Sequence, residues 1–397
     1  MEHHVINFKL DNSYIKTGYF PDIKILTHIS NQNIDNYILS KDDMKKLFIT
    51  KNKIDKYYNN NDYDNCWDVI KKSTNPYEMI YITNKKERNK SVSRYDPLSR
   101  SYFKMIEMGW EFCKKELSTN KPITTAHLAE GPGGFIEAIT TMRKNKNDRI
   151  FGMTLVSNSK EVPGWKKSWY FLSNNQNVNI LKGIDGTGNL YNIDNHIYME
   201  NRIGNDKALI ITGDGGFDFS VNFNQQEFQA QKLIFAQVIL ALSIQEIDGS
   251  FICKLFDTYS FVSNQILFLL MCCYRDVILF KPKTSRPANS EKYVICKGFN
   301  GISSSNIYKL RCVLDKWNHL PKNTYVLSLF DNIPYNYLSV MKHINKLIQN
   351  EQTNYIESTI CLMENPTNFD MKYAYTLEEQ IQLAQEWCIK YKIDYNY

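Results

Sequence analysis

Seven short apolar runs recur along the middle of the chain, and each has the length of a buried β-strand. Helix-length segments separate most of these runs, so the alternation predicts a mainly parallel sheet with helices on both faces. The runs are ITTAHLAE (123–130), RIFGMTL (149–155), NVNILKG (177–183), KALIITGDGG (207–216), GSFICKLF (249–256), DVILFKP (276–282) and KYVICKGF (292–299).

The last two runs are separated only by residues 283–290, a segment too short for a crossover helix. We therefore expect these two strands to pair antiparallel. Two long apolar stretches, Gln226–Gln245 and Phe261–Tyr274, are suited to helices that pack against the sheet. The central part of the chain is predicted to be a single α/β domain.

The pattern changes on both sides of this domain. Residues 1–94 are rich in Asn, Asp, Lys and Tyr, and their basic run from Lys85 to Arg94 is either a solvated face or a strip that contacts phosphates. After residue 300 we expect amphipathic helices around Tyr337–Gln349 and Thr376–Tyr391. We divide the chain into an N-terminal flanking region (1–94), the α/β domain (95–300) and a helical C-terminal extension (301–397).

Composition narrows the classes of protein only a little. The net charge of +6, from 48 basic and 42 acidic residues, favours an anionic partner weakly. Nine cysteines without a CxxC pair fit neither a zinc cluster nor a disulfide framework, so we expect reduced core thiols in an intracellular protein. No signal peptide is expected, and the longest apolar run, Ile266–Cys273, is too short to span a membrane. Frequent Asn, Lys and Ile fit an AT-rich genome, such as that of a large DNA virus, with the host cytoplasm or the virion as location.

A glycine-rich turn, Glu130-Gly-Pro-Gly-Gly134, follows the first apolar run and precedes a helix expected to begin near Gly134. Backbone amides at such a helix start attract a carboxylate or phosphate, and glycines allow close approach of a ligand. Tight turns from strand to helix also need glycine for structural reasons alone. No Gly-Lys-Ser/Thr follows, which excludes a Walker loop, and the spacing fits the dinucleotide fingerprint badly. S-adenosylmethionine remains the natural ligand for this turn.

Four charged residues stand in informative contexts. Asp214 follows an apolar strand inside a glycine turn, at the sheet edge where α/β proteins bind ligands. Lys254 interrupts the buried-looking strand FICKLF, where an unpaired charge is costly. Glu291 precedes the last strand, and Lys104 lies on an expected helix. Each has an ordinary structural explanation by itself: a turn former, a strand-end lysine whose charge reaches solvent, and two surface residues.

Taken together, the order Lys104, glycine turn, Asp214, Lys254 and Glu291 resembles the Lys-Asp-Lys-Glu tetrad of the FtsJ-like ribose 2′-O-methyltransferases. The segments FGMTL, GIDGTGN, DGGF, FICK, LFKP and SRPANSEKYVICKG look similar to the mRNA cap-specific 2′-O-methyltransferases of eukaryotes and viruses. The resemblance covers residues 75–299 and opens with Asn75-Pro-Tyr-Glu78. It implies a Rossmann-like methyltransferase fold with a mainly parallel, seven-stranded sheet whose last strand is antiparallel.

The resemblance also implies a role for each matching residue. Lys254 would be the general base that takes the proton from a ribose 2′-hydroxyl, with Lys104 and Glu291 aligning the reacting groups. Asp214 would lie between the cofactor and the lysines. Contacts to S-adenosylmethionine are expected from Ala129, Glu130, Gly131, Pro132, Gly133, Gly134, Phe135, Asn189 and Asp214, and contacts to RNA from Lys71, Asn224 and Asn289. No catalytic metal is expected.

Asn189 departs from the family pattern, which usually has an aspartate at this position. An asparagine side chain can still accept a hydrogen bond from the adenine amino group. Recognition of a cap would require an aromatic stack on the methylated guanine. The sequence does not rank the candidates Trp67 and Tyr95 for that stack.

Three functional hypotheses follow. The leading one is methylation of the ribose 2′-oxygen of the first transcribed nucleotide of capped mRNA, with the capping or transcription machinery as further partners. A second keeps the chemistry but acts on ribosomal or transfer RNA. A third is a catalytically idle RNA-binding subunit, which the intact tetrad disfavours.

Overall fold

The computed structural model describes residues 6–13, 15–16, 18–28, 34–58, 67–159, 162–216, 223–322, 324–365 and 374–396. Phe217, which ends the DGGF segment, lies outside these ranges. The strands are β1 Asn7–Leu10, β2 Ile23–His28, β3 Thr124–Leu128, β4 Arg149–Met153, β5 Val178–Leu181, β6 Ala208–Gly213, β7 Gln245–Leu255, β8 Tyr274–Phe280, β9 Lys292–Phe299 and β10 Tyr325–Phe330. The α-helices are α1 Lys41–Asn52, α2 Asp55–Tyr58, α3 Trp67–Ile70, α4 Ser101–Phe112, α5 Lys114–Leu117, α6 Gly134–Arg143, α7 Trp169–Asn174, α8 Ile193–Ile203, α9 Gln226–Ile244, α10 Phe261–Cys273, α11 Ser304–Asn318, α12 Tyr335–Glu364 and α13 Leu377–Tyr391.

All seven predicted runs form strands of one sheet, in the order β1-β8-β9-β7-β6-β3-β4-β5. Strands β5, β4, β3, β6 and β7 are mutually parallel. β9 pairs antiparallel with both β7 and β8, as the short connection between β8 and β9 predicts. The expected α/β fold is therefore confirmed.

The expected number of seven strands is wrong by one, because β1 of the N-terminal flanking region adds an eighth. It pairs antiparallel with β8 at the edge of the sheet. An exposed edge strand leaves a row of backbone N–H and C=O groups unpaired, and β1 supplies partners for them. β1 is only four residues long and lies far from β8 in the sequence. No local pattern of residues could therefore have predicted this strand.

Alternating side chains of the central strands pack into two separate cores, one on each face of the sheet. In β6, Ile210 belongs to the core formed with α4 and α6, whereas Ile211 belongs to the core formed with α9 and α10. In β7, Ile252 and Cys253 divide in the same way. Because both faces are covered, the strands read as continuous apolar runs in the sequence.

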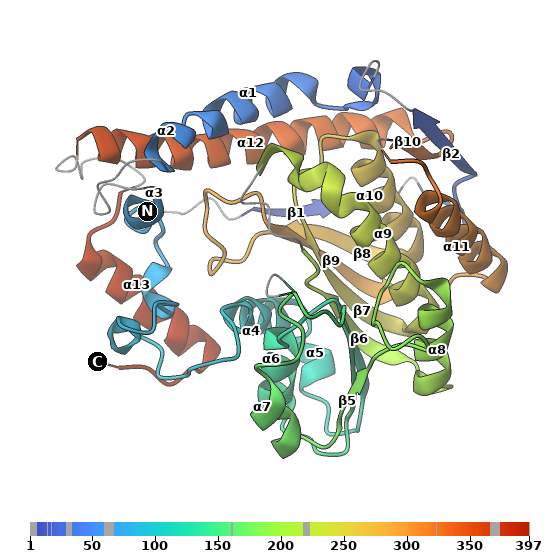
Figure 1. The fold of residues 1–397 in the computed structure, drawn as a ribbon, viewed down its shortest axis with the longest axis horizontal. Helices are drawn as coiled ribbons and strands as arrows, with labels where there is room; N and C mark the ends of the chain where they lie inside the picture. Colours follow the sequence, from blue (N-terminus) through green and yellow to red (C-terminus); the bar gives the residue numbers. More distant parts are fainter. Residues whose placement is uncertain are drawn as a thin grey trace.

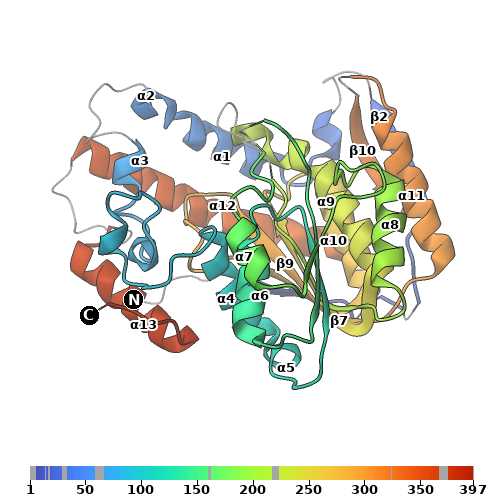
Figure 2. The same ribbon diagram turned by 60° about the horizontal axis from the view of Figure 1, so that its bottom comes forward.

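Figures 1 and 2 show the helices on the two faces of this sheet, with α4 and α6 on one side and α8, α9 and α10 on the other. The two helices expected at Gln226–Gln245 and Phe261–Tyr274 are confirmed as α9 and α10. Among the described helices, none is both long enough and apolar enough to cross a lipid bilayer.

The two flanking regions pack against each other and against the domain. β2 pairs antiparallel with β10, and α1 lies along α12 in both ribbon views (Figures 1 and 2). Leu47 of α1 and Ile356 of α12 share one buried cluster. The predicted C-terminal helices are confirmed, although α12 is much longer than expected. A capping box between Thr376 and Glu379 fixes the start of α13.

Candidate active site

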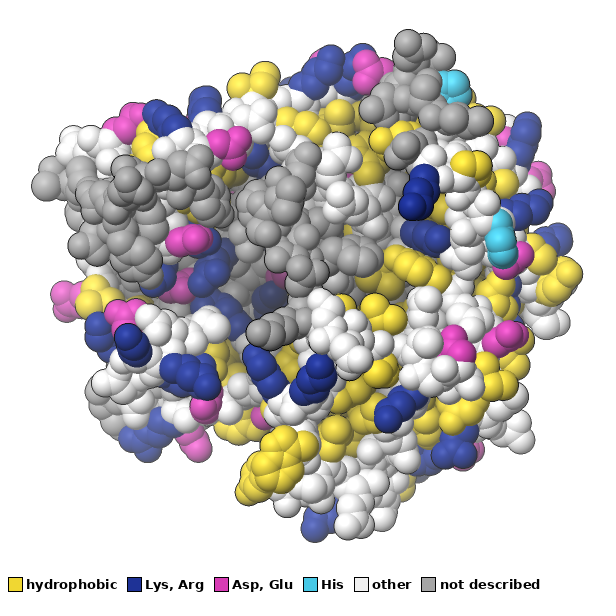
Figure 3. Space-filling view, in the orientation of Figure 1, with side chains coloured by type: hydrophobic (Ala, Val, Ile, Leu, Met, Phe, Trp, Pro, Cys, Tyr) yellow, Lys and Arg dark blue, Asp and Glu magenta, His cyan; other side chains and the backbone are white. Residues whose placement is uncertain are grey.

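A cleft of about 1620 Å³ lies at the carboxyl ends of β3, β6 and β7. Ligands bind at this edge in α/β proteins because the loops there diverge from the sheet. The cleft is lined by the domain and also by α1, α3 and α12 of the two flanking regions. Its described charged residues are Lys51, Lys71, Arg100, Lys254 and Arg286, and Asp55, Asp214 and Glu291. Figure 3 shows Lys and Arg side chains gathered in this hollow, in the left half of the view.

Lys254 and Asp214 form the first ion pair of the cleft. Lys254 Nζ donates to the backbone carbonyl of Asp214 at 2.7 Å and lies 3.4 Å from its Oδ1. Tyr293, the partner of Lys254 on the neighbouring strand β9, donates its hydroxyl to the same Oδ1 at 2.9 Å. A side chain at Gly216 would bring its Cβ to 3.0 Å from Lys254 Nζ. The absence of that side chain leaves the amine open to a ligand.

Lys104 and Glu291 form the second ion pair. Lys104 Nζ of α4 lies 2.5 Å from Glu291 Oε1, and Ser285 donates its hydroxyl to the same oxygen at 2.8 Å. Burial acts to raise the pKa of Glu291, but the ammonium groups of Lys104 and Lys254 lower it to about 2. Glu291 is therefore ionised and electrostatically linked to both lysines. The structure brings all four predicted tetrad residues together.

Burial acts to lower the pKa of Lys254, but the carboxylates of Asp214 and Glu291 outweigh it and raise that pKa above its ordinary value. Lys254 is thus protonated at neutral pH in the protein without ligands. Its neutral, proton-accepting form becomes more populated as the pH rises.

The glycine turn meets the cleft through two of its residues, and the residue just before the turn lines the cleft as well. α6 begins at Gly134 as predicted, after Gly133 in a left-handed conformation (φ 102°). Residues that line the cleft are Ala129, Gly131 and Pro132, whereas Glu130, Gly133, Gly134 and Phe135 are buried behind its wall. The carboxyl group of Glu130 accepts a hydrogen bond from Thr212, and burial raises its pKa.

The opposite wall of this part of the cleft contains Asn189, whose Oδ1 accepts from the backbone amide of Tyr191 at 3.0 Å. The neighbouring Gly188 approaches Thr154 so closely that an added Cβ would lie 2.0 Å from the Thr154 carbonyl oxygen. Thr154, Gly188 and Asn189 line the same cleft as Gly131 and Pro132 of the glycine turn. The donor set fits this cofactor: helix-start amides suit its carboxylate, and the Asn189 amide suits its adenine.

The three residues predicted to contact RNA all line the cleft on the side of the flanking regions. Lys71 pairs with Asp68, Asn224 donates to Asn52 of α1 at 2.9 Å, and Asn289 lies in the loop before β9. Their roles stay predictions.

The structure separates the two aromatic candidates for a cap stack. Trp67 lines the cleft. Tyr95 is not among the lining residues, because it stacks on Tyr102 at 4.6 Å between ring centroids and donates to Glu137 at 3.0 Å. Of the two, only Trp67 lies at the cleft, where 5% of its surface is exposed, against 36% for Tyr95.

Glu78, in the opening Asn-Pro-Tyr-Glu motif, fixes two arginines that line the cleft. Arg286 binds its carboxylate through two nitrogens at 2.8 and 3.1 Å, and Arg100 Nη1 lies 3.6 Å away. In the sequence this motif is recognisable only as part of the family resemblance, and the pairing of Glu78 with the two arginines was not predicted. The pairing joins residues 208 positions apart, and no local pattern reports such a contact.

Replacement of Glu78 by glutamine is expected to destabilise the protein by about 3 kcal/mol at pH 7, because two partly buried arginines, with 15% and 28% of their side chains exposed, lose their buried carboxylate partner. Burial acts to raise the pKa of Glu78, but Arg100 and Arg286 lower it from 4.5 to about 2. The stabilisation is therefore present above pH 4.5 and is lost as the pH falls toward 2. Urea unfolding of both proteins between pH 3 and 8 should show the difference narrowing below pH 4.5.

The matched control is Glu357→Gln, which removes an exposed carboxylate that bridges to Lys53. It should change stability by less than about 1 kcal/mol at every pH. A difference between wild type and Glu78→Gln that stays constant from pH 7 to pH 3 would contradict the expected ionisation.

Within the described ranges, no group of three or more His, Cys, Asp or Glu side chains is arranged to hold a metal ion.

The sheet order, the glycine turn and the paired lysines and carboxylates at the carboxyl edge together define a Rossmann-like methyltransferase. A family model, the FtsJ-like methyltransferases, matches residues 97–299, slightly more than half of the chain. The chain belongs to the FtsJ-like methyltransferase family, and the methyl donor of this family is S-adenosylmethionine.

Curated relatives carry a more specific description, cap-specific mRNA (nucleoside-2′-O-)-methyltransferase 1. The human protein is 35% identical over 271 residues, which cover 63% of this chain and 30% of the relative. The Ailuropoda melanoleuca protein is 33% identical over 249 residues (59% and 28%), and the Trypanosoma cruzi protein 35% over 196 residues (48% and 52%). The chain thus spans about a third to a half of the length of these relatives.

Among solved structures, one described as a ribosomal RNA methyltransferase from Plasmodium falciparum is 20% identical, with a TM-score of 0.38. The similarity covers 52% of this chain and all of the other. A TM-score this low carries no argument about function.

Proposed function

We propose that this chain transfers a methyl group from S-adenosylmethionine to the ribose 2′-oxygen of the first transcribed nucleotide of a capped mRNA. The observation that carries the proposal is the pair of ion pairs, Lys254 with Asp214 and Lys104 with Glu291, of which Asp214, Lys254 and Glu291 line one cleft beside the glycine turn. The relatives described as cap-specific mRNA methyltransferases support the choice of substrate.

Bound S-adenosylmethionine supplies a methyl group that its sulfonium already activates. The protein has two remaining tasks, to align a ribose hydroxyl with that methyl group and to remove one proton. Neutral Lys254 accepts the proton from the 2′-hydroxyl. Asp214 and Glu291 stabilise the ammonium that forms, because both carboxylates already raise the pKa of this lysine. Lys104 holds Glu291 in place at 2.5 Å.

The size and charge of the cleft support an RNA substrate. Its volume of about 1620 Å³ exceeds the roughly 300–1,000 Å³ that encloses one small ligand, so a cofactor and part of a nucleic acid fit together. Five lysines and arginines line it against three carboxylates, an excess that suits phosphate groups. In this proposal, Lys71, Asn224 and Asn289 contact the RNA, and Trp67 is the candidate for stacking on the cap guanine.

The test is transfer of a radiolabelled methyl group to one short RNA that carries either an N7-methylguanosine cap or a bare 5′ end. Label on the first ribose of the capped RNA alone is the expected result. Equal labelling of both RNAs would replace cap specificity with the broader hypothesis of ribosomal or transfer RNA. RNA binding without any label would favour an idle RNA-binding subunit.

A further inference from the structure

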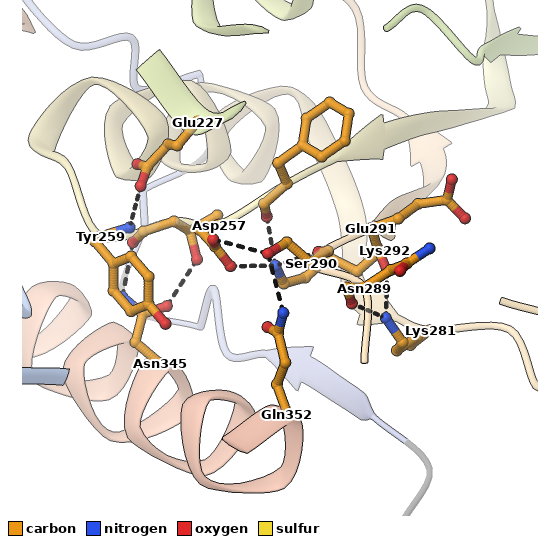
Figure 4. A network of polar contacts seen from close by, with 12 residues as sticks. Glu227, Asp257, Tyr259, Lys281, Asn289, Ser290, Glu291, Lys292, Asn345 and Gln352 are labelled. Carbon is orange, nitrogen blue, oxygen red and sulfur yellow. Dashed lines mark hydrogen bonds and ion pairs between the residues drawn. The ribbon is translucent and has the colours of Figure 1, made fainter. Parts of the chain in front are cut away.

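Glu291 lies at the end of the loop that joins β8 to β9, residues 281–291. This loop, named here the tetrad loop, carries one partner of the second ion pair, and loops move more readily than strands. Figure 4 shows a network of polar contacts around its last residues. The labelled partners in that network come from the domain and from α12 of the C-terminal extension.

The first support comes from the N-terminal flanking region. Lys51, in the last turn of α1, donates to Ser290 Oγ at 2.8 Å and to Asp257 Oδ2 at 3.2 Å. Ser290 Oγ in turn donates to Asp257 Oδ2 at 2.9 Å. All three side chains are buried, with 9% of the Lys51 side chain and 5% of the Asp257 side chain exposed. The residue directly before Glu291 is thus fixed by a lysine more than 200 positions away.

The second support comes from the C-terminal extension. Gln352 of α12 donates through Nε2 to the carbonyl of Ala288 at 2.9 Å and to Ser290 Oγ at 3.2 Å. In Figure 4 its side chain points from the helix toward Ser290. The domain itself adds Lys281, which donates to the backbone carbonyl of Glu291 at 2.8 Å.

Three charged side chains meet in this cluster. Burial acts to raise the pKa of Asp257, but Lys51 and Lys292 lower it, so the carboxylate is ionised between two cations. Lys292 Nζ lies 3.8 Å from Asp257 Oδ1 and donates to the carbonyl of Ser290 at 3.1 Å. A buried charge that loses one partner is strongly unfavourable, so the charges and their hydrogen bonds constrain one another.

We propose that Lys51 and Gln352 are positioning residues that act through Ser290 to hold Glu291 against Lys104, so that the two flanking regions complete the active site of the domain. The inference rests on the proposed function, in which Glu291 aligns the reacting groups. A displacement of about 1 Å in such a group can lower a rate by roughly 10²-fold. The flanking regions therefore act on the chemical step, in addition to any contact with RNA.

The variants for the test are Lys51→Met and Ser290→Ala in the full chain, each assayed with S-adenosylmethionine and capped RNA. We expect kcat to fall by roughly 10- to 100-fold while KM for S-adenosylmethionine changes less than about twofold, because the glycine turn is untouched. Lys51→Arg, which keeps a cation near Asp257, should recover part of the loss. When Lys51→Met and Ser290→Ala are combined, kcat should fall by much less than the product of the two single losses, because both changes act on one cluster.

The matched control is Lys53→Met, at the residue directly after α1. Lys53 also reaches α12, but it is half exposed and its partner at 3.3 Å is Glu357, a residue outside the tetrad loop. This variant should keep the kcat of the wild type. Loss of activity in Lys53→Met equal to that in Lys51→Met would mean that any disturbance of the flanking regions suffices, which overturns the proposal.

Hydrogen exchange supplies a readout that does not depend on turnover. Backbone amides of residues 283–291 should exchange faster in Lys51→Met and Ser290→Ala than in the wild type and in Lys53→Met. If the wild type methylates none of the RNAs, the proposed function fails, and exchange alone decides whether the flanks hold this loop. Exchange and turnover that match the wild type in both variants would overturn the inference.

Discussion

Replacement of Lys254 by alanine should lower kcat for methyl transfer by about 10³-fold or more, within the range of roughly 10²–10⁴ for general-base catalysis plus lost alignment. The amine lies 2.7 Å from the Asp214 carbonyl and is the group in the cleft that accepts the proton in the proposed mechanism. S-adenosylmethionine binding should change little, because Asp214 keeps the hydrogen bond from Tyr293 and the glycine turn is unchanged. Single-turnover rates and calorimetric titration of S-adenosylmethionine measure the two effects separately.

Two further variants sharpen this experiment. Lys254→Arg keeps the positive charge but cannot release its proton, so it should be as inactive as the alanine variant. Lys309→Ala removes an exposed lysine of α11 and should leave the rate unchanged. In the wild type the rate should rise with pH through the alkaline range, because the raised pKa of Lys254 keeps it protonated at neutral pH. A rate that survives in Lys254→Ala would disprove the role of Lys254 as the base.

Replacement of Gly188 by alanine should weaken S-adenosylmethionine binding by at least about tenfold and destabilise the protein by about 2–4 kcal/mol. Gly188 has a φ of 63°, and an added Cβ would lie 2.0 Å from the Thr154 carbonyl oxygen. The atom that the added Cβ would meet is a backbone carbonyl oxygen of Thr154, which cannot rotate away as the end of a flexible side chain can. The loop must therefore separate from Thr154, and Asn189 moves with it.

Gly186 provides the matched control for this change. It lies in the same loop with a similar φ of 75°, but no atom lies within 4 Å of an added Cβ. Gly186→Ala should cost only the conformational term of about 1–2 kcal/mol and leave cofactor affinity within about twofold. Thermal melts and calorimetric titrations of both variants give the comparison. Equal cofactor affinities for the two alanine variants would show that contact between the loops does not shape the cofactor site.

The sheet of the domain was predictable because its strands are buried on both faces. Ile210 and Ile211 enter different cores, so neighbouring positions of such a strand are both apolar and the run stands out from its surroundings. The antiparallel β9 followed from the length of one connection. In contrast, the alternation of polar and apolar residues in β1 is that of any short exposed segment. Its pairing with β8 can be recognised only in the folded structure.

The tetrad was predictable for a different reason. A lysine inside the apolar strand FICKLF is improbable unless a partner compensates its charge, so the sequence alone marks Lys254 as a candidate functional residue. The resemblance then supplied Lys104, Asp214 and Glu291. Lys292, at the start of the next buried strand, carried the same signal, and the sequence offered no partner for it.

The sequence by itself determined the alternation of strands and helices in the domain and the glycine turn, because these depend on local periodicity and on residue types at fixed places along the chain, whereas the tetrad was identified through the family resemblance. Only the tertiary structure decided the net effect on the pKa of Lys254, the link between Glu78 and Arg286, and the support of Glu291 by Lys51 and Gln352. Such effects depend on distances and burial between residues far apart in sequence. Folding alone sets these quantities, because it brings the flanking regions against the edge of the sheet.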